Sequence, residues 1–323
     1  MVALWRERFG AELEIINVGP GSVPDALPPG GCIQVQFAEE LTPREHAKLG
    51  TMLAGHPHAY LRAFCYFGQS EIRSLDFVKH YPSLTGFHAD LYDLKDFGGL
   101  RDLPRDIRYV GLGTTKYKVV DLRILQRLDA LEDLSLEGQV NGIGDLLASG
   151  RALRRLALKS VTLPGLSLLR PLKNLECFEL RLGGTRGLSL LPQIGRLQYL
   201  EIWMVKGLAD LSWLAKLTSL EELHLQSLAQ VKSLPRLSDL RRLKRVHLET
   251  MKGLVDVTPI SKAPALEKLS LIAMGHLQPE ALRPFVGHPT LRDCRIGLGS
   301  FRRNAAAYQL LGFPDPNAVA AKQ

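Results

Sequence analysis

The residues best suited to chemistry in this sequence are acids and histidines that recur at one spacing. Glu201, His224 and His247 follow one another at intervals of 23 residues, and Glu249 lies two residues after the last of them. Imidazole and carboxylate groups can bind a transition metal or act as an acid–base set for hydrolysis. We expect neither use, because no nucleophile can be assigned beside them and two histidines often meet by chance in a repeated sequence.

Motifs for other chemistry are weak or absent. Residues 111–116 (GLGTTK) faintly resemble a phosphate-binding loop but lack its spacing. No G-x-S-x-G, H-E-x-x-H or paired-cysteine motif occurs. His46, His56 and His58 lie around an expected helix, and we interpret them as surface histidines. The sequence therefore favours a protein without catalytic residues, bound metal or cofactor.

The 23-residue interval is also the period of the whole central sequence. An L-x-x-L-x-L pattern recurs, and a second apolar triplet follows it in each repeat. Residues two apart on a strand lie on the same face, and leucines three apart suit a 3₁₀ turn. Stacked coils bury these leucines against one another. The pattern starts at Leu61, Leu84, Ile107, Leu131, Leu153, Leu175, Leu197, Leu220, Leu243, Leu266 and Leu291.

These repeats resemble the leucine-rich-repeat superfamily, and within it the short-repeat class of internalins and phosphatase regulators. The leucines and the repeat length match, as do Asp145, Asp210 and Asp256. The asparagine of that class is missing, and apolar residues such as Val205 and Met251 stand in its place, so no asparagine ladder is expected. The resemblance implies an α/β right-handed solenoid (horseshoe), with a concave parallel sheet and convex short 3₁₀ or helical turns.

The ends of a solenoid must be shielded, and both ends carry helix signals. Thr42, Pro43 and Glu45 form an N-cap, a first-turn proline and a capping box, and Ser300 can cap a last helix. We see no linker and expect one domain. It comprises an N-terminal cap over 1–60 with strands and a helix over 43–54, about eleven repeats over 61–299, a capping helix over 300–313 and a disordered tail over 314–323.

Charge and composition restrict the partner and the compartment. The formal charge is +8 and the pI about 9.3, which leaves nucleic acid or an anionic surface possible. However, the columns expected on the concave sheet hold eight acidic and six basic residues, so the basic excess belongs to the convex side. Scattered cysteines, no signal-peptide core and no apolar run long enough to span a membrane predict a cytoplasmic protein. We also expect a monomer.

The candidate binding residues surround Tyr199 and Trp203. In-register strands align equal positions in columns, and the first repeat would place Ala63, Cys65 and Phe67 on the concave face. Exposed aromatics among charges of both signs are typical of protein-binding hot spots. The set is Glu179, Arg181, Tyr199, Glu201, Trp203, Glu222, His224, Gln226, Arg245, His247 and Glu249.

We therefore expect a non-catalytic module that recognises a protein or peptide on its concave sheet, as a regulator, an immunity-type inhibitor or an effector. One alternative is binding of nucleic acid or an anionic surface through a basic convex face. A second is a hydrolase that uses the concave glutamates and histidines.

Overall fold

The computed structural model describes residues 13–29, 31–66, 68–117, 119–185 and 187–316. The chain divides into two compact units, residues 1–155 and 156–323, and the boundary falls at the start of a strand in the middle of the repeats. Most of the tail expected to be disordered lies outside the described residues, as does Phe67. The domain limits expected from the sequence stay predictions.

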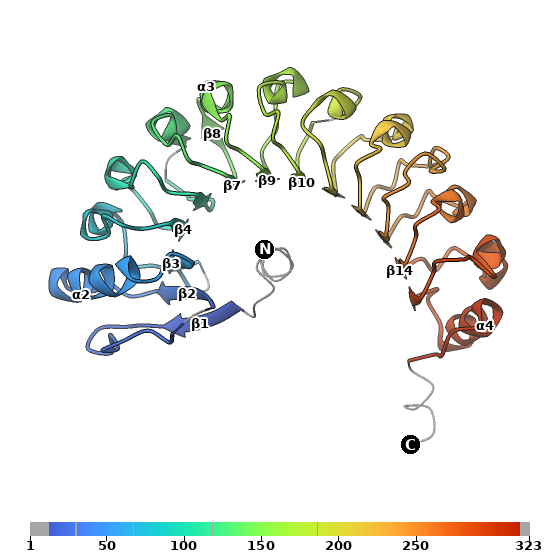
Figure 1. The fold of residues 1–323 in the computed structure, drawn as a ribbon, viewed down its shortest axis with the longest axis horizontal. Coiled ribbons are helices and arrows are strands. Elements are labelled where there is room, and N and C mark those ends of the chain that lie inside the picture. Colours follow the sequence, from blue (N-terminus) through green and yellow to red (C-terminus); the bar gives the residue numbers. More distant parts are fainter. Residues whose placement is uncertain (1–12, 30, 67, 118, 186, 317–323) are drawn as a thin grey trace. The chain divides into compact units, whose positions relative to one another are not determined.

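In the first unit, parallel strands line one side and short helices lie along the other (Figure 1). The strands pair in the order β1-β2-β3-β4-β5-β7, and β6 pairs with β8. The bounds are β1 (Leu13–Asn17), β2 (Cys32–Phe37), α2 (Pro43–Ala54), β3 (Ala59–Phe64), η1 (Asp76–His80), β4 (Gly86–Asp90), η2 (Gly98–Asp102), β5 (Tyr109–Leu112), β6 (Val120–Asp121), η3 (Leu122–Leu125), β7 (Asp133–Glu137), β8 (Val140–Asn141) and α3 (Ile143–Ser149).

The second unit repeats the same plan with one strand per coil, and α4 follows its last strand. Its strands pair in the order β9 to β15, all parallel where the register is defined. The bounds are β9 (Arg155–Lys159, at the boundary), η4 (Leu166–Leu169), β10 (Cys177–Arg181), η5 (Leu191–Gln193), β11 (Tyr199–Trp203), η6 (Ser212–Lys216), β12 (Glu222–Gln226), β13 (Arg245–Glu249), η7 (Thr258–Lys262), β14 (Lys268–Ile272), η8 (Pro279–Phe285), β15 (Asp293–Ile296) and α4 (Phe301–Leu311).

The core of each unit is built from the repeated leucines. In the second unit Leu200 aligns with Leu223, and Leu223 aligns with Val246. All three side chains are buried, because alternate strand residues point to opposite faces. The predicted leucine-rich-repeat solenoid is therefore confirmed. We call the opposite face of the strands, which carries the intervening residues, the sheet face.

The turns after the strands of the second unit have left-handed backbone next to the position where the resembled class carries asparagine. The residue that follows each of the strands β9 to β14 is left-handed, although none of these six residues is glycine; Leu182 (φ 57°) and Met204 (φ 50°) are examples. The N–H of Leu182 donates to the carbonyl of Trp203 at 2.8 Å, and the N–H of Met204 donates to the carbonyl of Gln226 at 2.9 Å. The next residue, such as Val205, can then turn into the core.

The capping helices follow the sequence signals. The hydroxyl of Thr42 accepts from the N–H of Glu45, whose side chain in turn accepts from the N–H of Thr42, so the capping box before α2 is present. Ser300 caps α4, and Gly312 ends it in the left-handed conformation. Both helices lie next to a terminal part of the repeats, as capping elements must.

One histidine assigned to the surface is buried. His46 on α2 is only 4% exposed, stacks against Phe77 and shares a 2.7 Å hydrogen bond between its Nδ1 and the Tyr81 hydroxyl. The surface interpretation of His46 was therefore wrong. The reason is that α2 packs its helical face onto η1, and a neutral imidazole with a polar partner can be buried there.

The register expected for the first repeat was also wrong. Leu61 aligns with Phe87 and Ala63 with Ala89, so Ala63 points into the core and is fully buried. The strand starts three residues earlier than the pattern suggested, because Leu61 with Phe64 imitates the start of a repeat. Tyr60 and Arg62 consequently take the sheet-face positions that were assigned to later residues.

Candidate functional site

The candidate residues share the sheet face of β10 to β13 in the second unit. Glu179, Glu201, His224 and His247 align one after another on neighbouring strands. Flanking columns hold Tyr199, Glu222 and Arg245 on one side and Arg181, Trp203, Gln226 and Glu249 on the other. The structure therefore brings the whole predicted set together in three adjoining columns, as the repeat register requires.

Arg181 joins two buried carboxylates across the strands. Its Nη2 lies 2.7 Å from Glu179 Oε2, and its Nε lies 2.7 Å from Glu201 Oε1. Glu179 is 0% exposed and Glu201 5% exposed, so these acids are covered rather than solvated. Burial alone would raise the pKa of Glu201, but the hydrogen bond and charge of Arg181 hold that pKa below its ordinary value.

Tyr199 adds a third contact to the same carboxyl group. Its hydroxyl donates to Glu201 Oε2 at 2.9 Å. Burial and the nearby negative charge of Glu201 raise the pKa of Tyr199 well above its ordinary value. The phenol therefore stays protonated and acts as a fixed donor that holds the ring in place.

Trp203 is half-buried rather than exposed as the sequence suggested, and so is Tyr199. Trp203 pairs in register with Arg181 on one side and Gln226 on the other. Its indole Nε1 is enclosed and has no hydrogen-bond partner among the described residues. A buried indole N–H usually finds an acceptor, so this donor is unsatisfied within the described part of the chain.

The adjoining strands carry the remaining charges. Arg245 forms an ion pair with Glu222, and His247 Nε2 lies 3.2 Å from Glu249 Oε2. The rings of His224 and His247 are 4.2 Å apart between centroids. Burial, followed by the charge of His247, lowers the pKa of His224, which favours its neutral form at neutral pH.

A depression extends this surface toward β14 and β15. It is lined by Tyr199, Glu222, His224, Arg245 and His247 together with residues of the last strands. The sequence placed those last residues in the same columns but did not select them, because no aromatic side chain stands among them. They are Lys268, Ser270, Asp293 and Arg295.

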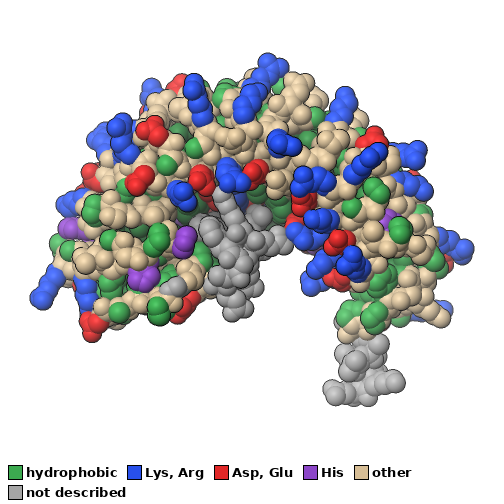
Figure 2. Space-filling model, viewed as in Figure 1, with side chains coloured by type: hydrophobic (Ala, Val, Ile, Leu, Met, Phe, Trp, Pro, Cys, Tyr) green, Lys and Arg blue, Asp and Glu red, His purple; other side chains and the backbone are tan. Residues whose placement is uncertain are grey.

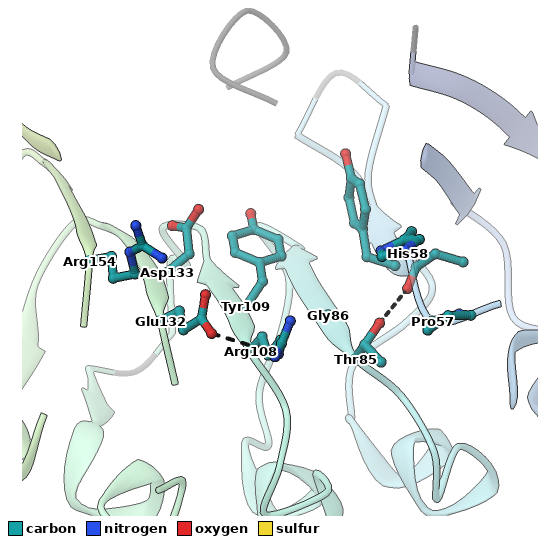
Figure 3. A pocket seen from close by; sticks show the side chains of 11 residues that line it. Pro57, His58, Thr85, Gly86, Arg108, Tyr109, Glu132, Asp133 and Arg154 are labelled. Atoms are coloured by element: carbon teal, nitrogen blue, oxygen red, sulfur yellow. Dashed lines mark hydrogen bonds and ion pairs between the residues drawn. The ribbon is translucent and has the colours of Figure 1, made fainter. Parts of the chain in front are cut away.

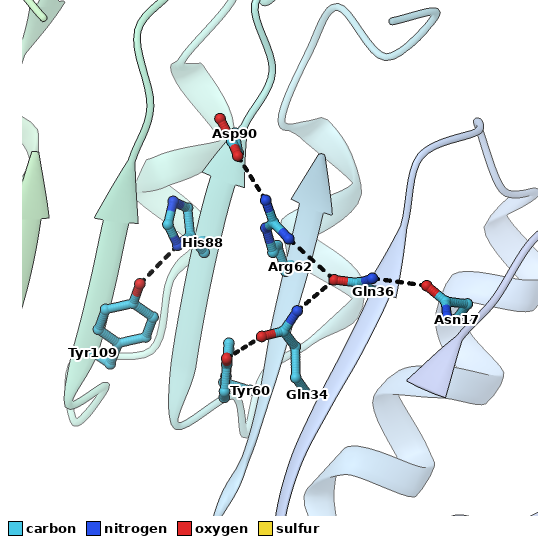
Figure 4. A network of polar contacts seen from close by, with 8 residues as sticks. All are labelled: Asn17, Gln34, Gln36, Tyr60, Arg62, His88, Asp90 and Tyr109. Carbon is cyan, nitrogen blue, oxygen red and sulfur yellow. Dashed lines mark hydrogen bonds and ion pairs between the residues drawn. The ribbon is translucent and has the colours of Figure 1, made fainter. Parts of the chain in front are cut away.

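The first unit holds a separate polar network that the sequence did not suggest. Gln36 accepts from Arg62 at 3.2 Å and donates to Asn17 at 2.7 Å, and Arg62 also pairs with Asp90 at 2.7 Å (Figure 4). Tyr60 donates to Gln34 in the same network. The corrected register of β3 brings these side chains onto one face.

A pocket lies beside this network at the start of β3, β4, β5 and β7 (Figure 3). Gly86 forms part of its wall between Tyr60 and Tyr109, where an added Cβ would lie 2.8 Å from Tyr60 Cβ. Arg108 and Glu132 approach to 3.7 Å at its rim. The packing of Tyr60 and Tyr109 at this pocket thus depends on glycine at position 86.

Charge is distributed rather than gathered on the face seen in Figure 2. Lys and Arg side chains are scattered over the helical side, whereas acidic and basic side chains intermix along the strands of the second unit. In the segments that lead into β12 and β13, Arg242 and Lys244 share Glu221 as an ion-pair partner. No helix in the described ranges has the length and apolar character needed to cross a membrane.

Comparisons with known proteins agree with the repeat. A sequence model of the R13L1/DRL21 leucine-rich repeats matches residues 186–251. Among curated proteins, none matches this chain.

The structure is similar to that of an internalin (inlF) from Listeria monocytogenes, with 15% identity over 79% of this chain and 80% of that one and a TM-score of 0.50. A leucine-rich-repeat protein from Leptospira interrogans aligns over 90% of this chain and 92% of its own at 14% identity and a TM-score of 0.47. The yeast Rad7 and Elc1 complex aligns over 86% of this chain and 72% of that one at 15% identity and a TM-score of 0.48. The chain thus carries matched leucine-rich repeats over residues 186–251 and has the fold of a leucine-rich-repeat protein.

Proposed function

We propose that this protein is a non-catalytic interaction module that binds a protein or peptide on the sheet face of β10 to β13. The main observation in support is that Arg181 is ion-paired with Glu179 and Glu201 while Tyr199 donates a hydrogen bond to Glu201. These contacts fix charged and aromatic groups before any partner arrives. A surface ordered in advance loses less side-chain freedom on binding, and this supports a recognition role.

The composition of the face also supports a protein partner. Tyr, Trp and Arg are enriched in interface hot spots, and Tyr199, Trp203 and Arg181 lie on two adjoining strands. The enclosed indole N–H of Trp203 has no acceptor among the described residues. A carbonyl or carboxylate oxygen of a partner could accept from it after a small rotation of the ring.

The hydrolase alternative has less support. Glu201 is ion-paired with Arg181 and its pKa is lowered, which suits a structural carboxylate better than a general acid. His247 contacts the carboxylate of Glu249, and within the described part of the chain His224 Nε2 has no hydrogen-bond partner. A nucleophilic mechanism needs a hydroxyl or thiol activated by such a base.

Quantitative affinity capture from the source organism tests the proposal. The bait proteins are the wild type, the sheet-face variant Tyr199→Ala/Trp203→Ala and the matched outer variant Arg241→Ala/Arg242→Ala. Arg241 and Arg242 are exposed in the turn that precedes β13, outside the sheet face. We expect a saturable protein partner that the sheet-face variant loses and the outer variant retains.

The opposite pattern would contradict the proposal. If the outer variant loses the captured material and the sheet-face variant keeps it, a basic surface outside the sheet face is the binding surface. Nuclease treatment of the captured material then separates a nucleic acid from a protein partner.

A further inference from the structure

We propose that His224, His247 and Glu249 form a binding site for one divalent transition-metal ion of the zinc type. The site lies on the sheet face of β12 and β13, and its three residues belong to the candidate partner-binding set. It does not depend on the proposed partner, because the ion would bind to this chain alone. The absence of a metal was the expectation from sequence, and the geometry of these three side chains supports revising it.

The repeat register brings the three side chains together. His224 pairs directly with His247 across two neighbouring strands, and Glu249 follows His247 by two residues, on the same face. One ligand atom from each residue lies within 4.8 Å of the other two. Two histidines that are 23 residues apart in the sequence therefore lie side by side, with their imidazole rings in contact.

The distances suit a single ion. Zinc binds imidazole nitrogen and carboxylate oxygen at about 2.0–2.2 Å, so two ligands of one tetrahedral shell lie about 3.3 Å apart. His247 Nε2 and Glu249 Oε2 are 3.2 Å apart. The rings of His224 and His247 are 4.2 Å apart between centroids with 52° between their planes, and a ring nitrogen of His224 lies within 4.8 Å of the other two ligand atoms.

One of the ring nitrogens lacks a partner. His224 Nε2 is enclosed and makes no hydrogen bond within the described residues. Enclosed polar atoms in native proteins are normally satisfied by protein, water or an ion. A metal ion between the two rings would satisfy this nitrogen and replace the contact between His247 and Glu249.

The surrounding charges permit a cation. Arg245 is ion-paired with Glu222, and Arg181 is ion-paired with Glu179 and Glu201. The positive charges nearest the site are therefore offset, and Glu249 supplies a negative charge of its own. Two nitrogens and one oxygen favour zinc, cobalt, nickel or copper over magnesium and calcium, which prefer oxygen ligands.

The test is titration of untagged, metal-free protein with Zn²⁺, followed by calorimetry and by metal analysis after dialysis. Mg²⁺ serves as the comparison ion, and Co²⁺ gives an absorption spectrum that reports the ligand set. The variants are His224→Ala, His247→Ala and Glu249→Gln. Glu249→Gln removes the charge and keeps the size of the side chain, so it distinguishes a lost ligand from a damaged structure. His276→Ala, outside the cluster, is the matched control.

We expect one Zn²⁺ per chain, no measurable Mg²⁺ binding, and affinity at least about tenfold weaker in each cluster variant, since even outer-shell changes cost that much. The His276→Ala variant should bind like the wild type. Failure to bind Zn²⁺ at one equivalent, or binding that the cluster variants retain, would overturn the proposal. Neither result bears on partner capture, so the proposed function is judged separately.

Discussion

The hydroxyl of Tyr199 donates to the carboxylate of Glu201, two residues further along β11, at 2.9 Å. That carboxylate is also the one that Arg181 reaches from the neighbouring strand. The aromatic ring and the ion pair on the sheet face are therefore one connected structure. The stability and the binding of this face should change together when its members are removed.

Removing Arg181 should be costly. Arg181→Ala leaves Glu179 and Glu201 buried without their counter-charge, and breaking a buried pair from one side costs about 3–5 kcal/mol. The exposed pair between Arg242 and Glu221 is the control, because surface ion pairs contribute about 0–1 kcal/mol. Denaturant melts of Arg181→Ala and Arg242→Ala measure both, and equal losses would contradict the buried arrangement.

Inward and outward residues of one strand should differ in their effect on stability. Leu223 is 1% exposed and fills the core, so Leu223→Ala should destabilise by about 2–5 kcal/mol. Glu222→Ala next to it should cost about 1 kcal/mol or less, because that side chain lies at the surface. Similar effects of the two substitutions in urea melts would show that the strand register is wrong.

The left-handed residues after the strands make a further prediction. Met204 has φ 50° and is 48% exposed. The backbone conformation, rather than side-chain packing, should therefore determine how substitutions at this residue change the stability. Left-handed backbone is unfavourable for residues with a Cβ, and glycine removes that penalty. Met204→Gly should therefore be about 1 kcal/mol more stable than Met204→Ala. A thermal melt in which the alanine variant is the more stable would argue against a strained turn.

These left-handed turns could not be predicted from the sequence, whereas the strands could. The period of 23 residues was enough to predict the strands, the core and the columns, because side-chain direction in a strand follows from position alone. The sequence carries no glycine or asparagine signal at Met204 or Leu182, so the left-handed turns were missed. They are imposed by the hydrogen bonds between coils.

Contacts between side chains could not be predicted from the repeat pattern either. The sequence placed Arg181, Glu179 and Glu201 on the same face, but the burial of the two glutamates depends on how neighbouring side chains cover them. In the first repeat Leu61 and Phe64 have the spacing of a repeat start, which led to the wrong register. With that register, the network around Arg62 could not be predicted. Irregular end repeats are where a periodic pattern fails first.

Stability should fall as the pH is lowered from about 6.5 to about 4. Burial lowers the pKa of His46 from 6.5 to about 4, so in this window the unfolded chain binds a proton that the folded protein does not. Each such histidine reduces the free energy of unfolding by up to about 1.4 kcal/mol per pH unit. Burial also lowers the pKa of His88 to about 4, which adds to the effect.

Denaturant melts across this window measure the slope for the wild type and for His46→Asn. The variant should lose part of the slope while remaining folded at neutral pH. An unchanged slope would mean that His46 is protonated in the folded protein and that its contact with Tyr81 does not keep it neutral.

The central claim is that this repeat protein binds its partner with the sheet face around Tyr199 and Trp203. Its most direct test is the dissociation constant of the captured partner, measured by calorimetry for the wild type and for Tyr199→Ala/Trp203→Ala. We expect binding to weaken by about 2–4 kcal/mol, or roughly 30- to 700-fold, with the thermal midpoint showing the variant still folded. An unchanged dissociation constant, together with a large loss in Arg241→Ala/Arg242→Ala, would contradict the claim.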